Sequence, residues 1–146
     1  MNNIEVTGGK AYQRKYAQSI AHFCIEKLMP RMQTLDVNIV LKSIKDKENT
    51  LGYCLSETNR EFEIEIDKSL PLRTLLTTVA HEMVHVKQFA RGELTEKQAW
   101  MGKTYDINKT QYWDLPWEIE AHGREVGLFI RWCQENNYDQ KWTKDF

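Results

Sequence analysis

The segment Glu61–Asp67 most constrains the fold, because it alternates acidic and hydrophobic residues without interruption as EFEIEID. Successive side chains of a β-strand point to opposite faces, so Phe62, Ile64 and Ile66 share one face and the acids share the other. This pattern predicts a strand with its hydrophobic residues directed inward and its acidic residues directed outward.

Two shorter segments, 37–41 and 51–55, show a similar alternation of hydrophobic and polar residues. The charged Lys45–Asn49 and the polar Glu57–Arg60 separate the three segments and are typical of turns. Because strands joined by short connections usually pair as neighbours, we expect a three-stranded antiparallel meander.

Hydrophobic residues recur at three- and four-residue spacing in three further segments, which predicts three helices. The first is expected over Lys10–Arg31, the second over Pro71–Ala90 with Ser69 as its cap, and the third over Pro116–Asn136. Residues 93–115 are expected to form a partly ordered loop with a small hairpin. The sequence thus predicts an α+β fold in one domain, 1–146: a helix, the meander, a helix, the loop and a last helix.

Composition narrows the class of protein. The 146 residues carry a net charge of -1 and are 41% hydrophobic, which suffices for a core but gives no basic excess for duplex binding. No hydrophobic run is long enough for a membrane helix, and the first residues do not resemble a signal peptide. The three cysteines have no metal-binding spacing and are expected to be reduced (Cys24, Cys54 and Cys133). These features predict a cytoplasmic protein without a membrane partner.

The second predicted helix contains the sequence HEMVH at residues 81–85. Histidines four residues apart project from one face of a helix, so His81 and His85 can share a metal ion, and Glu82 can take a proton from a water beside it. They lie opposite the hydrophobic stripe of this helix (Leu72, Leu75, Leu76, Val79, Met83 and Val86). That placement disfavours a pair of ordinary core histidines, and leaves a solvated, metal-free face as the alternative.

A hydrolytic zinc site usually has a third protein ligand, and the last helix offers candidates. A helical wheel places Glu118, His122 and Glu125 between two hydrophobic groups, whereas Glu120 joins Arg124 on a charged stripe expected to face solvent. An inward carboxylate needs a cation, so we select Glu118 as the third ligand. The alternative is that Glu118, in the first turn of the predicted helix, only stabilises the N-terminus of the helix through its negative charge.

His122 admits three interpretations at this stage. It lies one turn beyond Glu118, where it can support a ligand, replace Glu118 as the ligand, or be an ordinary half-buried histidine. Glu125 is assigned no role beyond an ion pair.

The HExxH helix, the preceding strands and the later inward Glu resemble the zincin metallopeptidases. The stretch Glu118-Ile119-Glu120-Ala121-His122 is similar to the Glu-x-x-Ala-Asp segment with which gluzincin-type members supply their third ligand, with His122 in place of Asp. In length and element order the chain also resembles small SprT-like domains, although it lacks their Gly-His motif and their zinc ribbon. The resemblance implies zinc as cofactor, His81, His85 and Glu118 as ligands, and hydrolysis of peptide bonds in a protein or peptide substrate with Glu82 as general base.

Other features of the site stay open. Tyr105, Tyr112 and Arg124 are candidates for stabilising the oxyanion, and none is preferred. The acidic segment Glu61–Asp67 is a candidate edge strand for binding extended, basic substrates, or an edge protected from aggregation by its charges. The loop aromatics can line a groove or form a small core of their own (Trp100, Tyr105, Tyr112, Trp113 and Trp117).

Three other functions compete with a general metallopeptidase. The chain is alternatively a catalytically inactive zincin scaffold that acts as an adaptor, a protease that acts on DNA-bound proteins, or a metal-free structural protein. The presence of Glu82 favours an enzyme. Aromatic stacking leaves a nucleic-acid partner open, although the charge balance gives it little support. The sequence does not determine the substrate or the oligomeric state.

Overall fold

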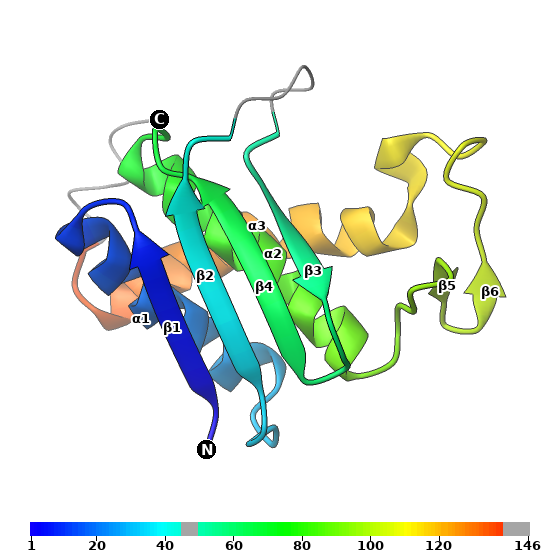
Figure 1. Cartoon of the computed structure of the whole chain (residues 1–146), viewed down its shortest axis with the longest axis horizontal. Helices are drawn as coiled ribbons and strands as arrows, with labels where there is room; N and C mark the ends of the chain where they lie inside the picture. The colour runs from blue at the N-terminus through cyan, green and yellow to red at the C-terminus, as the bar shows by residue number, and fades with distance from the viewer. Residues whose placement is uncertain (45–49, 139–146) are drawn as a thin grey trace.

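The computed structural model describes residues 1–44 and 50–138, which form a four-stranded sheet covered on one face by helices (Figure 1). The expected turn at Lys45–Asn49 lies outside the described residues. In chain order the elements are β1 (Asn3–Gly8), α1 (Ala11–Leu28), β2 (Asp36–Lys42), β3 (Gly52–Ser56), β4 (Glu61–Asp67), α2 (Leu72–Ala90), β5 (Ala99–Trp100), β6 (Lys103–Thr104), the 3₁₀ helix η1 (Tyr112–Asp114) and α3 (Pro116–Glu135).

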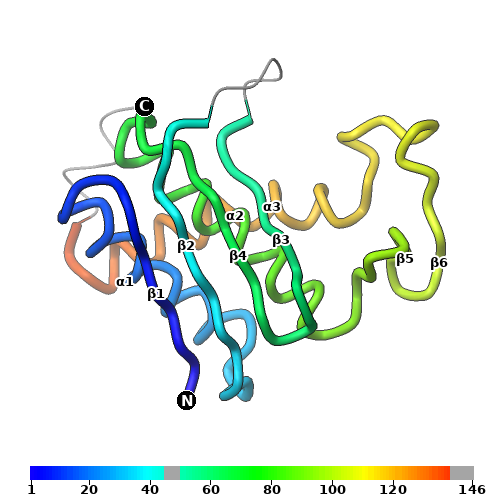
Figure 2. The backbone as a smooth tube through the Cα atoms, viewed as in Figure 1, coloured from blue at the N-terminus to red at the C-terminus, as the bar shows by residue number. Residues whose placement is uncertain are grey.

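The sheet is mixed and not a meander, so the expected three-stranded antiparallel arrangement is wrong. Its strand order is β1-β2-β4-β3, in which β1 and β4 pair in parallel with β2 and only β3 runs antiparallel to β4. The chain trace in Figure 2 shows β2 and β4 side by side with β3 beyond them. The meander fails because β4 lies between β2 and β3 and runs parallel to β2, and an additional strand, β1, pairs with the other side of β2. Because the 18-residue helix α1 connects β1 to β2, these two strands can run in the same direction.

The places of β4 and β3 in the sheet differ, and so does the burial of their side chains. Phe62, Ile64 and Ile66 of β4 are buried, as the alternation predicts, and this strand lies inside the sheet. It is therefore not the edge strand that the sequence offered as a candidate. The two edge strands are β1 and β3. On β3 the larger hydrophobic residues face away from the helices: Tyr53 and Leu55 are 36% and 49% exposed beside the acids of β4, while Cys54 packs against the core.

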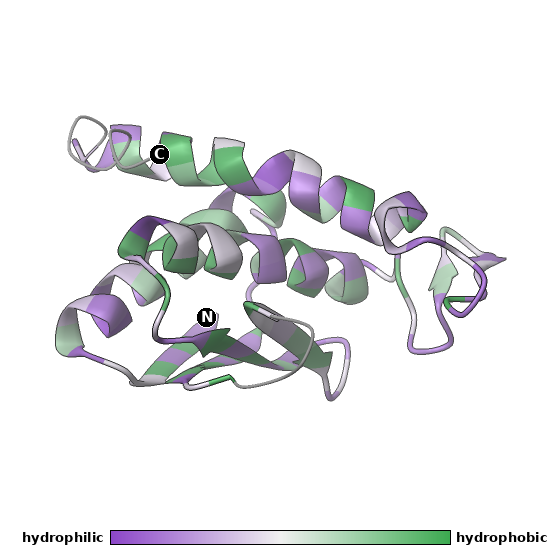
Figure 3. Ribbon diagram, turned by 90° about the horizontal axis from the view of Figure 1, so that it is seen from above, coloured by the Kyte–Doolittle hydropathy of each residue, from purple (hydrophilic) through white to green (hydrophobic). Residues whose placement is uncertain are grey.

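The helices form two layers over the sheet. Figure 3 shows α1 and α2 against the sheet and α3 lying over α2 on the far side. Because α2 lies between the sheet and α3, it is buried nearly all around, polar residues included. The surface between α2 and α3 is therefore the place where polar residues of both helices meet inside the protein.

The helix boundaries agree closely with the sequence analysis. All three helices begin within two residues of the expected positions, and α2 and α3 end within one residue. Ser69 is not the cap of α2, because its hydroxyl donates to Asp67 and Pro71 precedes the helix. The loop contains the expected small hairpin, with Gly102 at a φ of 86° between β5 and β6.

Among the described residues, no helix combines the length and the hydrophobicity that a membrane span requires.

Candidate metal centre

The HEMVH residues occupy the middle of α2, where the helix is covered by both the β3 edge and α3. His81, Glu82 and His85 are all buried, so the solvated face considered above is wrong. A buried charge requires a partner, which makes the surroundings of these three residues decisive.

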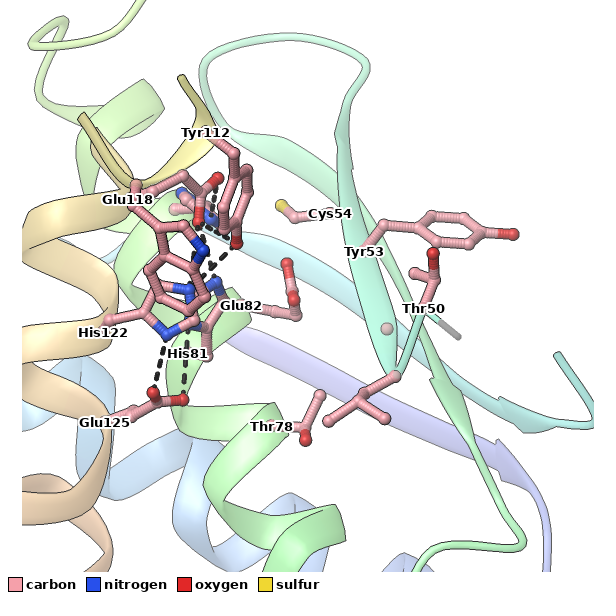
Figure 4. Close-up of a pocket in the computed structure, with 14 residues that line it drawn as sticks. Thr50, Tyr53, Cys54, Thr78, His81, Glu82, Tyr112, Glu118, His122 and Glu125 are labelled. Atoms are coloured by element: carbon pink, nitrogen blue, oxygen red, sulfur yellow. Dashed lines mark hydrogen bonds and ion pairs between the residues drawn. The ribbon is translucent and has the colours of Figure 1, made fainter. Parts of the chain in front are cut away.

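Glu118 supplies the contact from α3. Its Oε1 lies 3.1 Å from His81 Nε2 and its Oε2 lies 3.2 Å from His85 Nε2, so one carboxylate spans both rings. Figure 4 shows the carboxylate of Glu118 beside the ring of His81. Neighbouring ligands of a tetrahedral zinc ion are about 3.3 Å apart, given bonds of roughly 2.0–2.1 Å. The ligand atoms of His81, His85 and Glu118 all lie within 4.8 Å of one another, so these residues are close enough to hold a metal ion.

A second residue of α2, Gln88, fixes the orientation of His85. Its Oε1 lies 2.7 Å from His85 Nδ1, and its Nε2 donates to the carbonyl of Trp117 and to Glu120. Because these two donor bonds define which amide atom is the oxygen, His85 donates from Nδ1 to Gln88, and its Nε2 faces Glu118. Gln88 is fully buried, and the sequence analysis did not identify it.

Glu125 has the corresponding position behind His81. Its Oε2 is 3.4 Å from His81 Nδ1, at ion-pair distance, and its Oε1 is 2.8 Å from His122 Nδ1. A carboxylate behind a metal-binding histidine orients the ring and increases its basicity. Glu125 was assigned no role from the sequence, yet its position seven residues after Glu118 places it on the same face of α3.

His122 lies beside the group formed by His81, His85 and Glu118 and is not part of it. Its Nε2 is 4.0 Å from Glu118 Oε1, and its ring centre is 4.5 Å from that of His81. The donor atoms of His81, His122 and Glu125 nevertheless form a second group within 4.8 Å of one another. His122 thus lies between the carboxylates of Glu118 and Glu125.

Tyr112 completes the surroundings from the short helix η1. Its hydroxyl lies 2.9 Å from both Glu118 Oε1 and His122 Nε2, directly at the carboxylate that spans the histidines. We call these residues, with Glu82, the histidine cluster (His81, Glu82, His85, Tyr112, Glu118, His122 and Glu125).

A second polar group, the lysine cluster, lies next to it, where the end of α2 and the loop that follows meet α3 (Lys87, Glu93, Glu120 and Arg124). Lys87 Nζ is 2.8 Å from Glu93 and 2.7 Å from Glu120, and Arg124 donates to Glu120 at 3.0 Å. Glu120 thus pairs with Arg124 as the charged stripe suggests. It does not face solvent, however, because the buried Lys87 holds its side chain at 18% exposure.

The electrostatics of the histidine cluster give its carboxyl groups different properties. Burial by itself raises the pKa of Glu118, but the hydrogen bonds from His81 and His85 outweigh it and hold the pKa well below its usual range. Burial also raises the pKa of Glu82, and the two histidines only partly offset it. Glu118 is therefore kept ionised, as a ligand must be, whereas burial shifts Glu82 toward its protonated form.

The contacts that lower the pKa of Glu118 raise the pKa of His81. Burial lowers its pKa, but the contacts with the carboxylates of Glu118 and Glu125 outweigh burial and raise the pKa to about 10. The two carboxylates thus attract a positive charge to this position, whether a proton or a metal ion.

The histidine cluster opens into a cleft of about 680 Å³ between α2, α3 and β3. The residues Gly52, Tyr53 and Cys54 of β3 line one side, and Glu82 points into the space between that strand and the histidines (Figure 4). The exposed ring of Trp113 lies 4.7 Å from His122 at the rim. The cleft is large enough for a peptide segment.

The remaining candidates from the sequence lie elsewhere. Of the three oxyanion candidates only Tyr112 lines the cleft; Tyr105 packs against Trp117, and Arg124 contacts Glu120. The loop aromatics divide between the two expected roles. Tyr112 and Trp113 line the cleft, while Trp100, Tyr105 and Trp117 form a small core with Leu94 and Leu115.

Comparison of the chain with protein-family profiles, with curated proteins and with solved structures gave no match. The chemistry of the histidine cluster is therefore the basis for assigning a function.

Proposed function

We propose that this protein is a zinc-dependent metallopeptidase in which His81, His85 and Glu118 hold the metal and Glu82 is the general base. The observation that supports it best is the single carboxylate of Glu118 that spans the two Nε2 atoms, at 3.1 and 3.2 Å. Two imidazoles and one carboxylate form the ligand set of several catalytic zinc sites, which keep one further position for water or substrate.

Zinc, when bound, lowers the pKa of a water toward about 7 and polarises the carbonyl of the scissile peptide bond. With a metal held by His81, His85 and Glu118, Glu82 would act as the general base: it would take a proton from a water in the cleft and pass it to the amine that leaves. The raised pKa of Glu82, caused by its burial, suits a group that must both accept and release a proton.

Tyr112 is the residue of this chain best placed to donate a hydrogen bond to the carbonyl oxygen as it becomes negative. Its hydroxyl lies at Glu118 on the cleft side of the cluster, and His122 at 2.9 Å holds it in position. Donors of this kind typically contribute about 10²–10³-fold to kcat.

The test compares zinc content and cleavage of denatured casein between the wild-type protein and Glu82→Gln. We expect Glu82→Gln to retain one zinc per chain and to lose about 10²–10⁴-fold in kcat, because the general base is gone while the ligands remain. Tyr112→Phe serves as a second variant, with zinc retained and a smaller loss in kcat. Full activity of Glu82→Gln, or absence of cleavage by zinc-loaded wild-type protein, would refute the proposal.

A further inference from the structure

A second hollow, which we call the side pocket, lies next to the metal cleft. It has a volume of about 590 Å³ and is bounded by the end of β3, the end of α2 and the loop that leads to α3. Its lining is largely apolar, with Phe89, Leu94, Leu115 and Trp117 on the inside. The last three residues form the small core under the loop, so this wall of the pocket is packed before anything binds.

The side pocket and the metal cleft share two lining residues, Cys54 and Tyr112, and therefore adjoin. Both hollows also follow β3, since Gly52 lines the cleft and Ser56 lines the side pocket. Because β3 forms an outer edge of the sheet, an extended segment can lie along it and pass through both hollows.

The direction of such a segment decides which of its residues reaches the side pocket. Antiparallel pairing is slightly more stable per residue than parallel pairing, so we take the bound segment to run against β3. The side pocket lies toward the end of β3, beyond the cleft. When the scissile bond of such an antiparallel segment lies at Glu82, the residues that precede this bond reach the side pocket.

We infer that the side pocket binds a bulky apolar side chain, such as Leu, Phe or Met, that precedes the scissile bond by one to four residues. This inference rests on the proposed function for the position of the bond, and it adds the substrate class: extended segments exposed from unfolded or flexible protein, with a large apolar residue before the cut. One methylene group more or fewer on a side chain that fills a hydrophobic pocket typically changes kcat/KM by about 10–200-fold.

The experiment maps cleavage sites in denatured casein by mass spectrometry and then compares synthetic peptides that differ only by Leu or Ala at the enriched position. We expect Leu to exceed Ala by at least about 10-fold in kcat/KM. Ile107→Asp, at the rim of the side pocket and 44% exposed, should reduce that ratio to near one. The matched control Met101→Asp is on the same loop, is 64% exposed and does not line the pocket, so it should keep the wild-type ratio.

Binding separates this inference from the proposed function. The same two peptides are titrated calorimetrically into zinc-loaded Glu82→Gln and into Glu82→Gln with Ile107→Asp. A preference for Leu that depends on Ile107, without any cleavage by the wild-type protein, supports the side pocket and refutes the peptidase. Cleavage without a preference before the bond, or a preference equal in Ile107→Asp and wild type, refutes the side pocket and leaves the peptidase standing.

Discussion

The histidine cluster and the lysine cluster lie next to each other where α2 and the loop that follows it meet α3, and they differ in how their charges balance. In the lysine cluster two cations, Lys87 and Arg124, meet two carboxylates, Glu93 and Glu120. In the histidine cluster the ion pairs described for Glu118 and Glu125 all have histidines as partners, and Glu82 adds a third acid. The lysine cluster therefore has no net charge, whereas the histidine cluster is negatively charged when its histidines are neutral.

This difference shows why burial of an acid alone does not identify a metal ligand. Glu118 and Glu120 are two residues apart on α3 and similarly buried, at 12% and 18% side-chain exposure. Glu120 has a lysine at 2.7 Å and needs no further cation. Glu118 faces only imidazole Nε2 atoms, so its charge can be balanced by protons on these rings or, with the rings neutral, by a divalent ion.

The largest effect is expected from removing the two carboxylates in turn. Glu118→Ala should weaken zinc binding about 10²–10³-fold, roughly the share of one ligand in the binding free energy of a structural zinc site. Glu120→Ala should leave zinc affinity close to that of the wild type, since the carbonyl of Trp117 still holds Gln88. Competition with a fluorescent chelator measures both. If Glu120→Ala were the variant that loses zinc, the comparison between the two acids would be reversed.

The next effect concerns the groups behind the histidines. Glu125→Leu and Gln88→Leu remove the partners of His81 Nδ1 and His85 Nδ1, and each should lower zinc affinity about 10–100-fold while keeping one zinc per chain. The same chelator competition gives the affinities, and elemental analysis gives the stoichiometry. Unchanged affinity in both variants would show that these groups pack against the rings without orienting them for the metal.

The smallest effect is expected in the lysine cluster. Lys87→Met keeps the length of the side chain but leaves Glu93 and Glu120 without their shared cation, which should lower the free energy of unfolding by about 2 kcal/mol. Urea denaturation of the zinc-loaded protein measures the change. Zinc stoichiometry should stay at one per chain, and loss of zinc from this variant would mean that the two clusters act as one.

The sequence predicted the helices well because long periodic segments report directly on local structure. It did not predict the sheet topology, since alternation identifies a strand without giving its partner. The short strand β1 has one buried residue, Ile4, and gave no clear pattern. On β3 the larger residues Tyr53 and Leu55 face outward, so hydrophobicity alone indicated the wrong face.

The candidate site was predictable to a similar extent. His81, Glu82 and His85 follow from a local motif, and the inward direction of Glu118 follows from the hydrophobic residues on either side of it. Gln88 escaped detection, and Glu125 was assigned no more than an ion pair, because their partners depend on how α2 and α3 are placed against each other. A helical wheel gives the face of a residue and not the atom that it meets across an interface.

Anomalous diffraction at the zinc edge from crystals grown with zinc tests the central claim most directly. The account predicts one peak per chain, about 2.0–2.2 Å from His81 Nε2, His85 Nε2 and a carboxylate oxygen of Glu118. A peak held by His122 and Glu125 in place of these atoms, or no peak between α2 and α3, would contradict it.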